Sequence, residues 1–143
     1  MRPVPKSPVL AYPIPGTLDE VLGFELLEGT GDRCRARFPV ADRVRQPAGL
    51  VHGGAYAALA ESMVSITTHA QVADDGQLAL GQSNDTSFLR PITEGYVNAE
   101  ARPRHRGRST WIWDVEFTDD EGRLCAISRV TVAVRPAPLE RPS

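Results

Sequence analysis

The sequence predicts an α+β domain in which a curved antiparallel sheet of about six strands wraps around one long central helix. Two observations predict this architecture. Residues 53–73 are apolar on almost every side of a helix, which is typical of a buried element. Most of the remaining chain alternates apolar and polar residues, which is typical of strands that bury one face. Since one helix has to cover many strands, we expect the sheet to curl around it.

The segment before the long helix predicts a short helix and a hairpin. Residues 17–22 favour a helix, with Thr17 as its N-cap and Glu20 at the capping-box position. Residues 24–28 and 33–40 flank a glycine-containing turn, which indicates two paired strands. In the second strand, arginines alternate with small and apolar residues, so we expect one charged face and one buried face.

The segment after the long helix predicts three or four antiparallel strands. Alternating patterns separated by turn residues place them at 78–90, 96–106, 111–117 and 124–134. Together with the hairpin, they supply a sheet large enough to cover the helix.

Length and proline distribution predict the domain organisation. The chain has 143 residues and a mass of 15.6 kDa, which fits a single domain. Eight of its twelve prolines fall in residues 3–15 and 136–142, where they disfavour helices and central strands. We therefore expect an extended N-terminal tail over residues 1–16, one domain over 17–135 and a C-terminal tail over 136–143.

Charge and motif content exclude several classes of protein. A net charge of −2 and a pI near 5.9 do not suit a nucleic-acid-binding protein. No apolar run reaches the roughly 18 residues of a membrane span, and the N-terminus lacks the apolar core of a signal peptide, so we expect a cytoplasmic protein without a membrane partner. Cys34 and Cys125 are interpreted as free, buried thiols. No zinc, P-loop or dinucleotide motif occurs, so no metal and no separate cofactor is expected.

The candidate chemistry gathers in residues 46–65. The Gly53-Gly54 pair opens the long helix and leaves backbone N–H groups that suit a carbonyl becoming an oxyanion, although an ordinary tight turn would use the same residues. Glu61 lies roughly two turns further on, where burial of a carboxylate costs several kcal/mol unless the group is paired or solvated by a cavity, so a carboxylate here is either compensated in one of these ways or kept for chemistry. Ser65 follows on the same face, where with Glu61 it could orient a water or attack an acyl carbon. The alternative is a polar stripe that faces solvent or a partner subunit.

Two further groups are candidates for substrate binding. Gln46 and His52 bracket the loop before the helix and can hydrogen-bond a substrate oxygen, and His52 can instead support the loop. Arginines that alternate on one predicted strand face precede two hydroxyl side chains at a turn, and such a patch can hold phosphates or form a solvated sheet face. The residues of this patch are Arg102, Arg104, Arg106, Ser109 and Thr110.

Four features of this segment occur together: Gln46, His52-Gly53-Gly54, Glu61 and Ser65. In this combination they resemble the hotdog-fold acyl-CoA thioesterases, above all the phenylacetate-pathway group and the 4-hydroxybenzoyl-CoA thioesterases that use a helix glutamate. The likeness extends from about residue 17 to residue 134. It implies a hotdog fold that pairs into a homodimer and often a homotetramer, with active sites at the dimer interface.

The resemblance implies a role for each candidate residue. The Gly53 N–H would polarise the thioester carbonyl, with Gln46 nearby. Glu61, contributed by the other subunit, would act as nucleophile or general base, and Ser65 would orient a water. The CoA phosphates would lie against Ser109, Thr110 and the arginines of the preceding strand. Many members pair an asparagine before the glycines with an aspartate on the helix, whereas this chain has Gln46 and Glu61, which favours the aryl-CoA glutamate type.

The expected function is hydrolysis of an acyl-CoA, aryl or medium-chain, to a free acid and CoA, so that CoA is part of the substrate. The main alternative is a hotdog module that binds an acyl-CoA or an aromatic ligand without turnover, and a hydratase or dehydratase is a third. Aromatic side chains that line an acyl pocket on one interpretation, or belong to the core on the other, are Tyr56, Phe88, Trp111 and Trp113.

Overall fold

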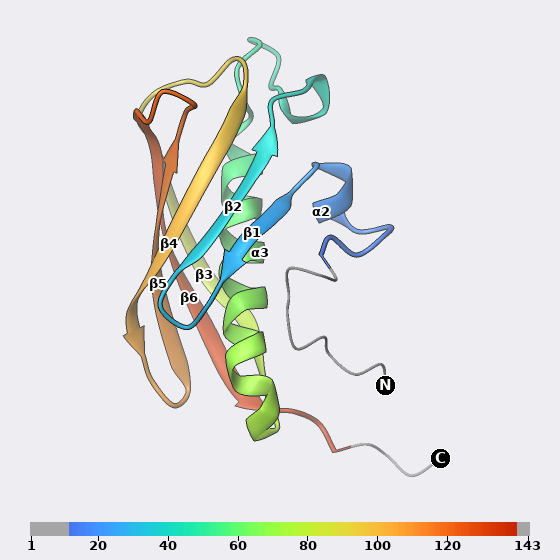
Figure 1. Cartoon of the computed structure of the whole chain (residues 1–143), viewed down its shortest axis with the longest axis vertical. Helices are drawn as coiled ribbons and strands as arrows, with labels where there is room; N and C mark the ends of the chain where they lie inside the picture. Colours follow the sequence, from blue (N-terminus) through green and yellow to red (C-terminus); the bar gives the residue numbers. More distant parts are fainter. Residues whose placement is uncertain (1–11, 140–143) are drawn as a thin grey trace.

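The computed structural model describes residues 12–139 and consists of one antiparallel sheet, one long helix and short helical turns (Figure 1). The helical elements are α2 (Leu18–Val21), η1 (Asp42–Val44), α3 (Gly53–Val72) and η2 (Ala73–Asp75). The strands are β1 (Glu25–Gly29), β2 (Cys34–Pro39), β3 (Gln77–Phe88), β4 (Tyr96–Arg106), β5 (Thr110–Thr118) and β6 (Leu124–Pro136). The parts of the expected tails at 1–11 and 140–143 lie outside the described residues. No helix within residues 12–139 is long and apolar enough to cross a membrane.

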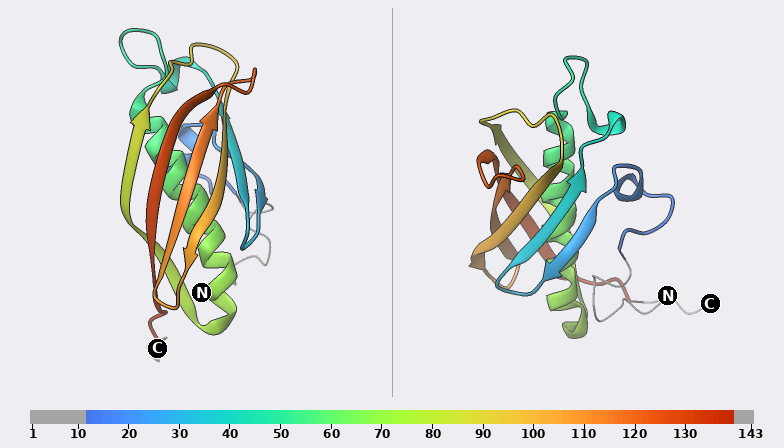
Figure 2. Two further views of the ribbon diagram at one scale, coloured as in Figure 1. Left: turned by 90° about the vertical axis from the view of Figure 1, so that its left-hand side faces the viewer. Right: turned by 45° about the horizontal axis from the view of Figure 1, so that its top comes forward.

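The six strands form a single sheet in the order β1-β2-β4-β5-β6-β3, and every pairing is antiparallel. Figure 2 shows this sheet curving over α3, which lies against its concave face. The predicted α+β architecture is therefore confirmed. The two edge strands differ in length, since β1 has 5 residues and β3 has 12. β3 consequently presents a long row of backbone groups with no neighbouring strand on its outer side.

Alternation along the strands sends apolar side chains to the concave face. In β2, Cys34, Ala36 and Phe38 are buried, whereas the arginines between them are not. On α3, Tyr56 meets Phe117 of β5 edge-on, with 5.3 Å between the ring centroids. These contacts hold one face of α3 against the sheet, and the opposite face of the helix stays available to other elements.

The short helix α2 has the predicted N-cap, but it does not form the predicted capping box. The Thr17 side chain accepts a hydrogen bond from the Glu20 backbone N–H at 3.4 Å. The Glu20 carboxylate accepts from the Gly16 N–H, one residue before the N-cap. Asp19 accepts a hydrogen bond of 2.9 Å from Ser62, and this contact attaches α2 to α3.

Both cysteines are free and buried, as predicted. Burial raises the pKa of the Cys34 thiol to about 12, and the Thr67 hydroxyl lies 3.1 Å from its sulfur. Burial also raises the pKa of the Cys125 thiol. Both groups therefore stay protonated near neutral pH and pack as small apolar side chains.

A buried hydrogen-bonded pair joins α3 to β5. The Thr68 hydroxyl donates to the Val64 carbonyl at 2.7 Å and accepts from the Trp113 indole N–H at 2.9 Å. Thr68 and Trp113 are both fully buried. Loss of the Thr68 hydroxyl would leave the indole N–H without a partner in the core, which carries a desolvation penalty.

We predict that Thr68→Val lowers the free energy of unfolding by about 1–3 kcal/mol, because the change keeps the side-chain volume but orphans the indole N–H. Thr68→Ser, which keeps the hydroxyl, is the matched control and should lose less stability. Urea denaturation followed by tryptophan fluorescence measures both variants. Equal losses in the two would contradict the hydrogen-bond explanation.

Candidate active site

The N-terminus of α3 presents a free backbone amide. His52 is the N-cap, and its Nδ1 accepts a hydrogen bond from the Gly54 N–H at 2.8 Å. Within residues 12–139, the Gly53 N–H has no acceptor. An unpaired amide at the positive end of a helix dipole suits an oxyanion. His52 Nδ1 thus supports the start of the helix, the substrate contact expected of His52 stays a prediction, and the Gly53 N–H is available as a donor.

Gly53 also permits a close contact with β3. A Cβ atom at this position would lie 2.5 Å from the ring of Phe88. Phe88 is 57% exposed, and its ring packs against that of Tyr56 with 5.8 Å between the centroids. The Phe88 ring therefore forms a wall beside the free amide.

Glu61 is exposed in the single chain, so the prediction that α3 buries this carboxylate is wrong for an isolated protomer. The carboxylate lies over Gly81 of β3, where a Cβ atom would be 2.6 Å from Glu61 Oε1. Because β3 is an edge strand, no further strand lies beyond it to cover the carboxylate. In the single chain the alternative interpretation holds, which is a polar stripe that faces solvent or a partner.

Gly53 and Glu61 line the same open groove of about 480 Å³ between α3 and β3. The helix contributes mostly small residues, which keep the groove wide, and the strand contributes its inward-facing side chains. The lining residues are Gly53, Gly54, Ala57, Ala58, Glu61, Asn84, Thr86 and Phe88.

Two polar residues of the groove, Asn84 and Thr86, were missed by the sequence analysis. Asn84 Nδ2 donates to the Ala57 carbonyl of α3 at 2.9 Å, and the Thr86 hydroxyl donates to Asn84 Oδ1 at 2.7 Å. A strand that covers an apolar helix is expected to point apolar residues at it. Polar residues at these alternate positions of β3 were the available signal.

Two predicted site residues, Ser65 and Gln46, do not line the groove. Ser65 Oγ is buried and has no hydrogen-bond partner among the described residues. The Gln46 side chain accepts from the Ala48 N–H, and its backbone N–H donates to the Leu50 carbonyl at 2.9 Å. Gln46 is thus turned back on its own loop, and the substrate contacts expected of both residues stay predictions.

Of the four aromatic candidates for an acyl pocket, only Phe88 lines this groove. Tyr56 lies behind it and is buried. Trp111 and Trp113 are buried in β5, with 6.0 Å between their ring centroids. For these last three residues the core interpretation is the correct one.

The predicted phosphate-binding arginines do not share one face of β4. A β-bulge shifts the register in the middle of this segment. As a result Arg102 lies opposite Asp114, whereas Arg106 lies opposite the buried Trp111. Directly opposite residues of paired strands point to the same face, so Arg102 and Arg106 point to different faces. The prediction of one continuous arginine face is wrong for this reason.

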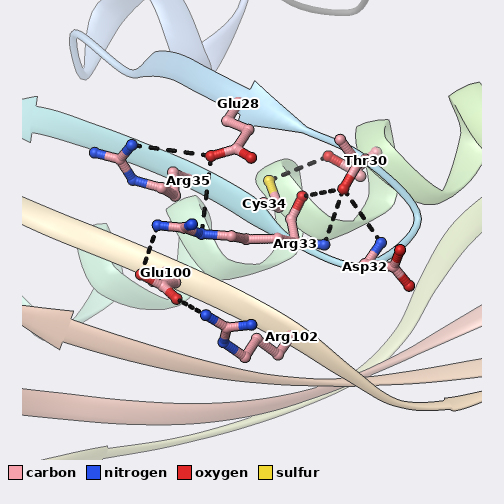
Figure 3. Close-up of polar contacts among 9 residues, drawn as sticks. Glu28, Thr30, Asp32, Arg33, Cys34, Arg35, Glu100 and Arg102 are labelled. Atoms are coloured by element: carbon pink, nitrogen blue, oxygen red, sulfur yellow. Dashed lines mark hydrogen bonds and ion pairs between the residues drawn. The ribbon is translucent and has the colours of Figure 1, made fainter.

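Each of the three arginines also pairs with an acidic residue of the chain, and Figure 3 shows the network around Arg102 on β4 and its neighbour β2. Glu100 accepts from Arg102 at 2.7 Å and from Arg33 at 3.4 Å. The other two pairs are Arg104–Asp114 at 3.3 Å and Arg106–Asp32 at 3.1 Å. Exposed pairs of this kind contribute little stability, and they leave these guanidinium groups available to stronger anions.

The turn that follows these arginines lies near the far end of α3. Arg106 Nη1 and Gln71 Oε1 both approach Gly31 of the β1–β2 turn. Gln71 is about 27 Å from Gly53 along the helix axis. Ser109 and Thr110, at the β4–β5 turn, are thus not brought to the Gly53 end of their own chain.

Gly53 and Glu61 are themselves well separated. Eight residues of helix place them about 12 Å apart along the axis. One reacting carbonyl needs its oxygen donor and its attacking group within about 3–3.5 Å. In a single chain, therefore, the oxygen donor lies at one end of the groove and the attacking group lies at the other, too far apart to act on the same carbonyl.

Comparison with known proteins identifies the family. A profile described as Thioesterase superfamily matches residues 48–126. The proofreading thioesterase EntH of Cronobacter turicensis is 40% identical over 119 residues, which cover 83% of this chain and 86% of that protein. The chain belongs to the thioesterase superfamily, and it is a thioester hydrolase.

Solved structures agree with this assignment and with the hotdog fold. A thioesterase of Pseudomonas aeruginosa, solved with a glutamine replaced by alanine, has a TM-score of 0.81 and 34% identity, covering 85% of this chain and 87% of that chain. A Staphylococcus aureus protein, solved with a glutamate replaced by alanine, has a TM-score of 0.80 and 31% identity, covering 84% and 99%. That protein was also solved with a glutamine replaced, described there as a thioesterase, and the two substituted positions are fifteen residues apart, as Gln46 and Glu61 are here.

We predict that Gly53→Ala lowers kcat/KM at least about 10-fold, because the new methyl group pushes the Phe88 ring out of place while the N–H donor is kept. The exposed ring can swing away, so the unfolding midpoint should change little. Phe88→Ala is the matched background, measured by thioester hydrolysis. If the ring is responsible, Gly53→Ala adds no further loss there, and additive losses would contradict this explanation.

Proposed function

We propose that the chain hydrolyses acyl-CoA thioesters, with the Gly53 N–H as the oxyanion donor and Glu61 as the nucleophile or general base. The observation that carries the proposal is the groove that holds both an amide without an acceptor and an exposed carboxylate. A thioester is an activated acyl group, so polarisation by one amide together with a positioned carboxylate suffices for its cleavage.

Two routes are compatible with this arrangement. As a base, Glu61 takes a proton from water, whose oxygen attacks the carbonyl carbon, and the resulting oxyanion accepts from the Gly53 N–H. Collapse breaks the carbon–sulfur bond and the thiolate leaves with a proton. As a nucleophile, the Glu61 carboxylate forms the bond itself and expels the thiolate, and water then hydrolyses the mixed anhydride. Both routes yield one free acid and one CoA.

The separation of Gly53 and Glu61 supports a site shared by two subunits. In a two-fold pair of antiparallel helices, residues that lie equally far on either side of the axis face each other. Ala57 lies midway between Gly53 and Glu61, so two α3 helices that cross at Ala57 bring the amide of one protomer beside the carboxylate of the other. Gly54, Ala57 and Ala58 are small enough for a close approach.

The exposed edge of β3 supports the same pairing. A two-fold axis beside an edge strand joins it to its copy in antiparallel fashion and satisfies the unpaired backbone groups of both. Leu80 of β3 is 60% exposed in the single chain. Antiparallel pairing also brings the partner's β4–β5 turn to the Gly53 end of the groove. We therefore propose that Ser109, Thr110 and Arg106 bind the CoA phosphates and that the chain forms a homodimer or homotetramer.

The acyl group is proposed to be aryl or medium-chain. The small residues of α3 leave space above the helix, and the Phe88 ring offers an apolar wall beside the reacting carbon.

The equal separation of the glutamine and the glutamate in the Staphylococcus aureus protein supports Gln46 and Glu61 as a functional pair.

We predict that Glu61→Gln lowers kcat by about 100-fold or more on a panel of aryl and aliphatic acyl-CoA esters, because the amide cannot take a proton or attack. Release of free CoA thiol measures turnover, and circular dichroism checks that the variant folds. The ester with the highest kcat/KM identifies the acyl class. No turnover of any of these esters by the wild type would contradict the proposed substrate class, and turnover indifferent to this change would exclude Glu61 as the base or nucleophile.

We predict that two weakly active variants, Glu61→Gln and Gly53→Ala, complement each other when co-expressed. If the site is shared, each mixed dimer holds one intact site, and random pairing restores about a quarter of the wild-type activity. Thiol release by the purified mixture measures this. Activity equal to the mean of the two separate variants would place both groups in one chain.

A further inference from the structure

The wall of the groove contacts α3 at one stripe of the helix. Along α3 the contacted residues are Gly53, Ala57 and Glu61, each one turn from the next. The partners on the inner face of β3 are Phe88, Asn84 and Gly81, respectively. The edge strand therefore meets the helix at both proposed catalytic groups and midway between them.

The φ of Gly81 lies outside the left-handed region, so its own dihedral angle does not require glycine. Gly81 pairs with Val132 of β6 at the start of a β-bulge, where the register shifts between Gly81 and Ser83. Its Cβ, if present, would lie 2.6 Å from Glu61 Oε1, 2.9 Å from Cγ and 3.1 Å from Cδ. The whole end of the Glu61 side chain thus occupies the space that any other residue at position 81 would fill.

Asn84 fixes the same stretch of β3 against the helix. The Thr86 hydroxyl donates to Asn84 Oδ1 at 2.7 Å, which leaves Nδ2 as the donor to the Ala57 carbonyl. Because the Thr86 proton is used in this way, Ser128 is the donor in its 2.7 Å contact with Thr86. This chain of hydrogen bonds runs from β6 through β3 to the turn of α3 that precedes Glu61.

Asn84 is exposed on an edge strand, so its side chain does not pack in the hydrophobic core. We propose that Gly81 and Asn84 are positioning residues that together set where the Glu61 carboxylate stands in the groove: Gly81 by leaving its space open, and Asn84 by holding the strand at a fixed distance from the helix. The inference rests on the proposed role of Glu61.

The test compares Gly81→Ala and Asn84→Ala with Ser87→Ala, a control on the exposed, outward-facing side of the same strand. We expect kcat to fall about 10-fold or more in Gly81→Ala and about 3- to 10-fold in Asn84→Ala, with KM within about 3-fold of the wild type. Ser87→Ala should retain wild-type kinetics. Size-exclusion chromatography and thermal unfolding show whether assembly and folding are kept.

Double variants separate positioning from general damage to the fold. In a Glu61→Gln background, Gly81→Ala and Asn84→Ala should each change the residual rate less than 2-fold, because the group that they position is already absent. Full, independent losses in that background would overturn the inference, as would wild-type kcat in both single variants. If Glu61→Gln itself leaves kcat unchanged, the proposed function fails instead, so the two failures are distinguishable.

A conservative substitution at Thr86 tests the hydrogen-bond chain separately. Thr86→Ser keeps the donor to Asn84 and should retain kcat, whereas Thr86→Val removes it and should resemble Asn84→Ala. Equal kcat in the two Thr86 variants would show that the hydrogen-bond chain does not position Glu61, and it would restrict the role to Gly81.

Discussion

The close approach of α3 to the edge strand β3 is the constraint on which the site depends. The sheet covers the helix on its apolar side, but β3 ends the sheet before it can cover the side that carries Glu61. Glycines at positions 53 and 81 let helix and strand approach where an aromatic ring and a carboxylate lie between them. A groove results because β3 is the last strand on this side of the sheet and lines the groove with only Asn84, Thr86 and Phe88.

The fold could be predicted because its signals are local and periodic. The apolar helix and the alternating strands were recognised, and the arginine-bearing face of β2 lies outward as expected. The exposure of Glu61 could not be predicted, because it depends on which strand stands at the edge, and strand order is a long-range property. The bulge in β4 was missed for a related reason: Arg102 and Arg106 are an even number of residues apart, and only pairing with β5 reveals the extra residue between them.

The candidate site divides in the same way. Gly53 and Glu61 were recognised from one contiguous segment, and both line the groove. Asn84 and Thr86 come from β3, and the spacing of the chain alone does not show that the Asn84 side chain reaches the Ala57 carbonyl of α3. His52 illustrates a different limit, since a residue before two glycines can contact a substrate or cap a helix, and only the structure reveals the 2.8 Å capping contact with the Gly54 N–H.

The position of the groove wall at the rim of the sheet has a consequence for how this protein can change over evolutionary time. Substitutions in a packed core disturb many neighbours and are largely destabilising. Phe88, in contrast, is more than half exposed and belongs to the last strand of the sheet. New side chains at this position can reshape the groove at little cost to folding, whereas Tyr56 of α3 is fixed in the core by its contact with Phe117. The wall of the groove can therefore vary along one strand while the helix that carries Gly53 and Glu61 stays the same.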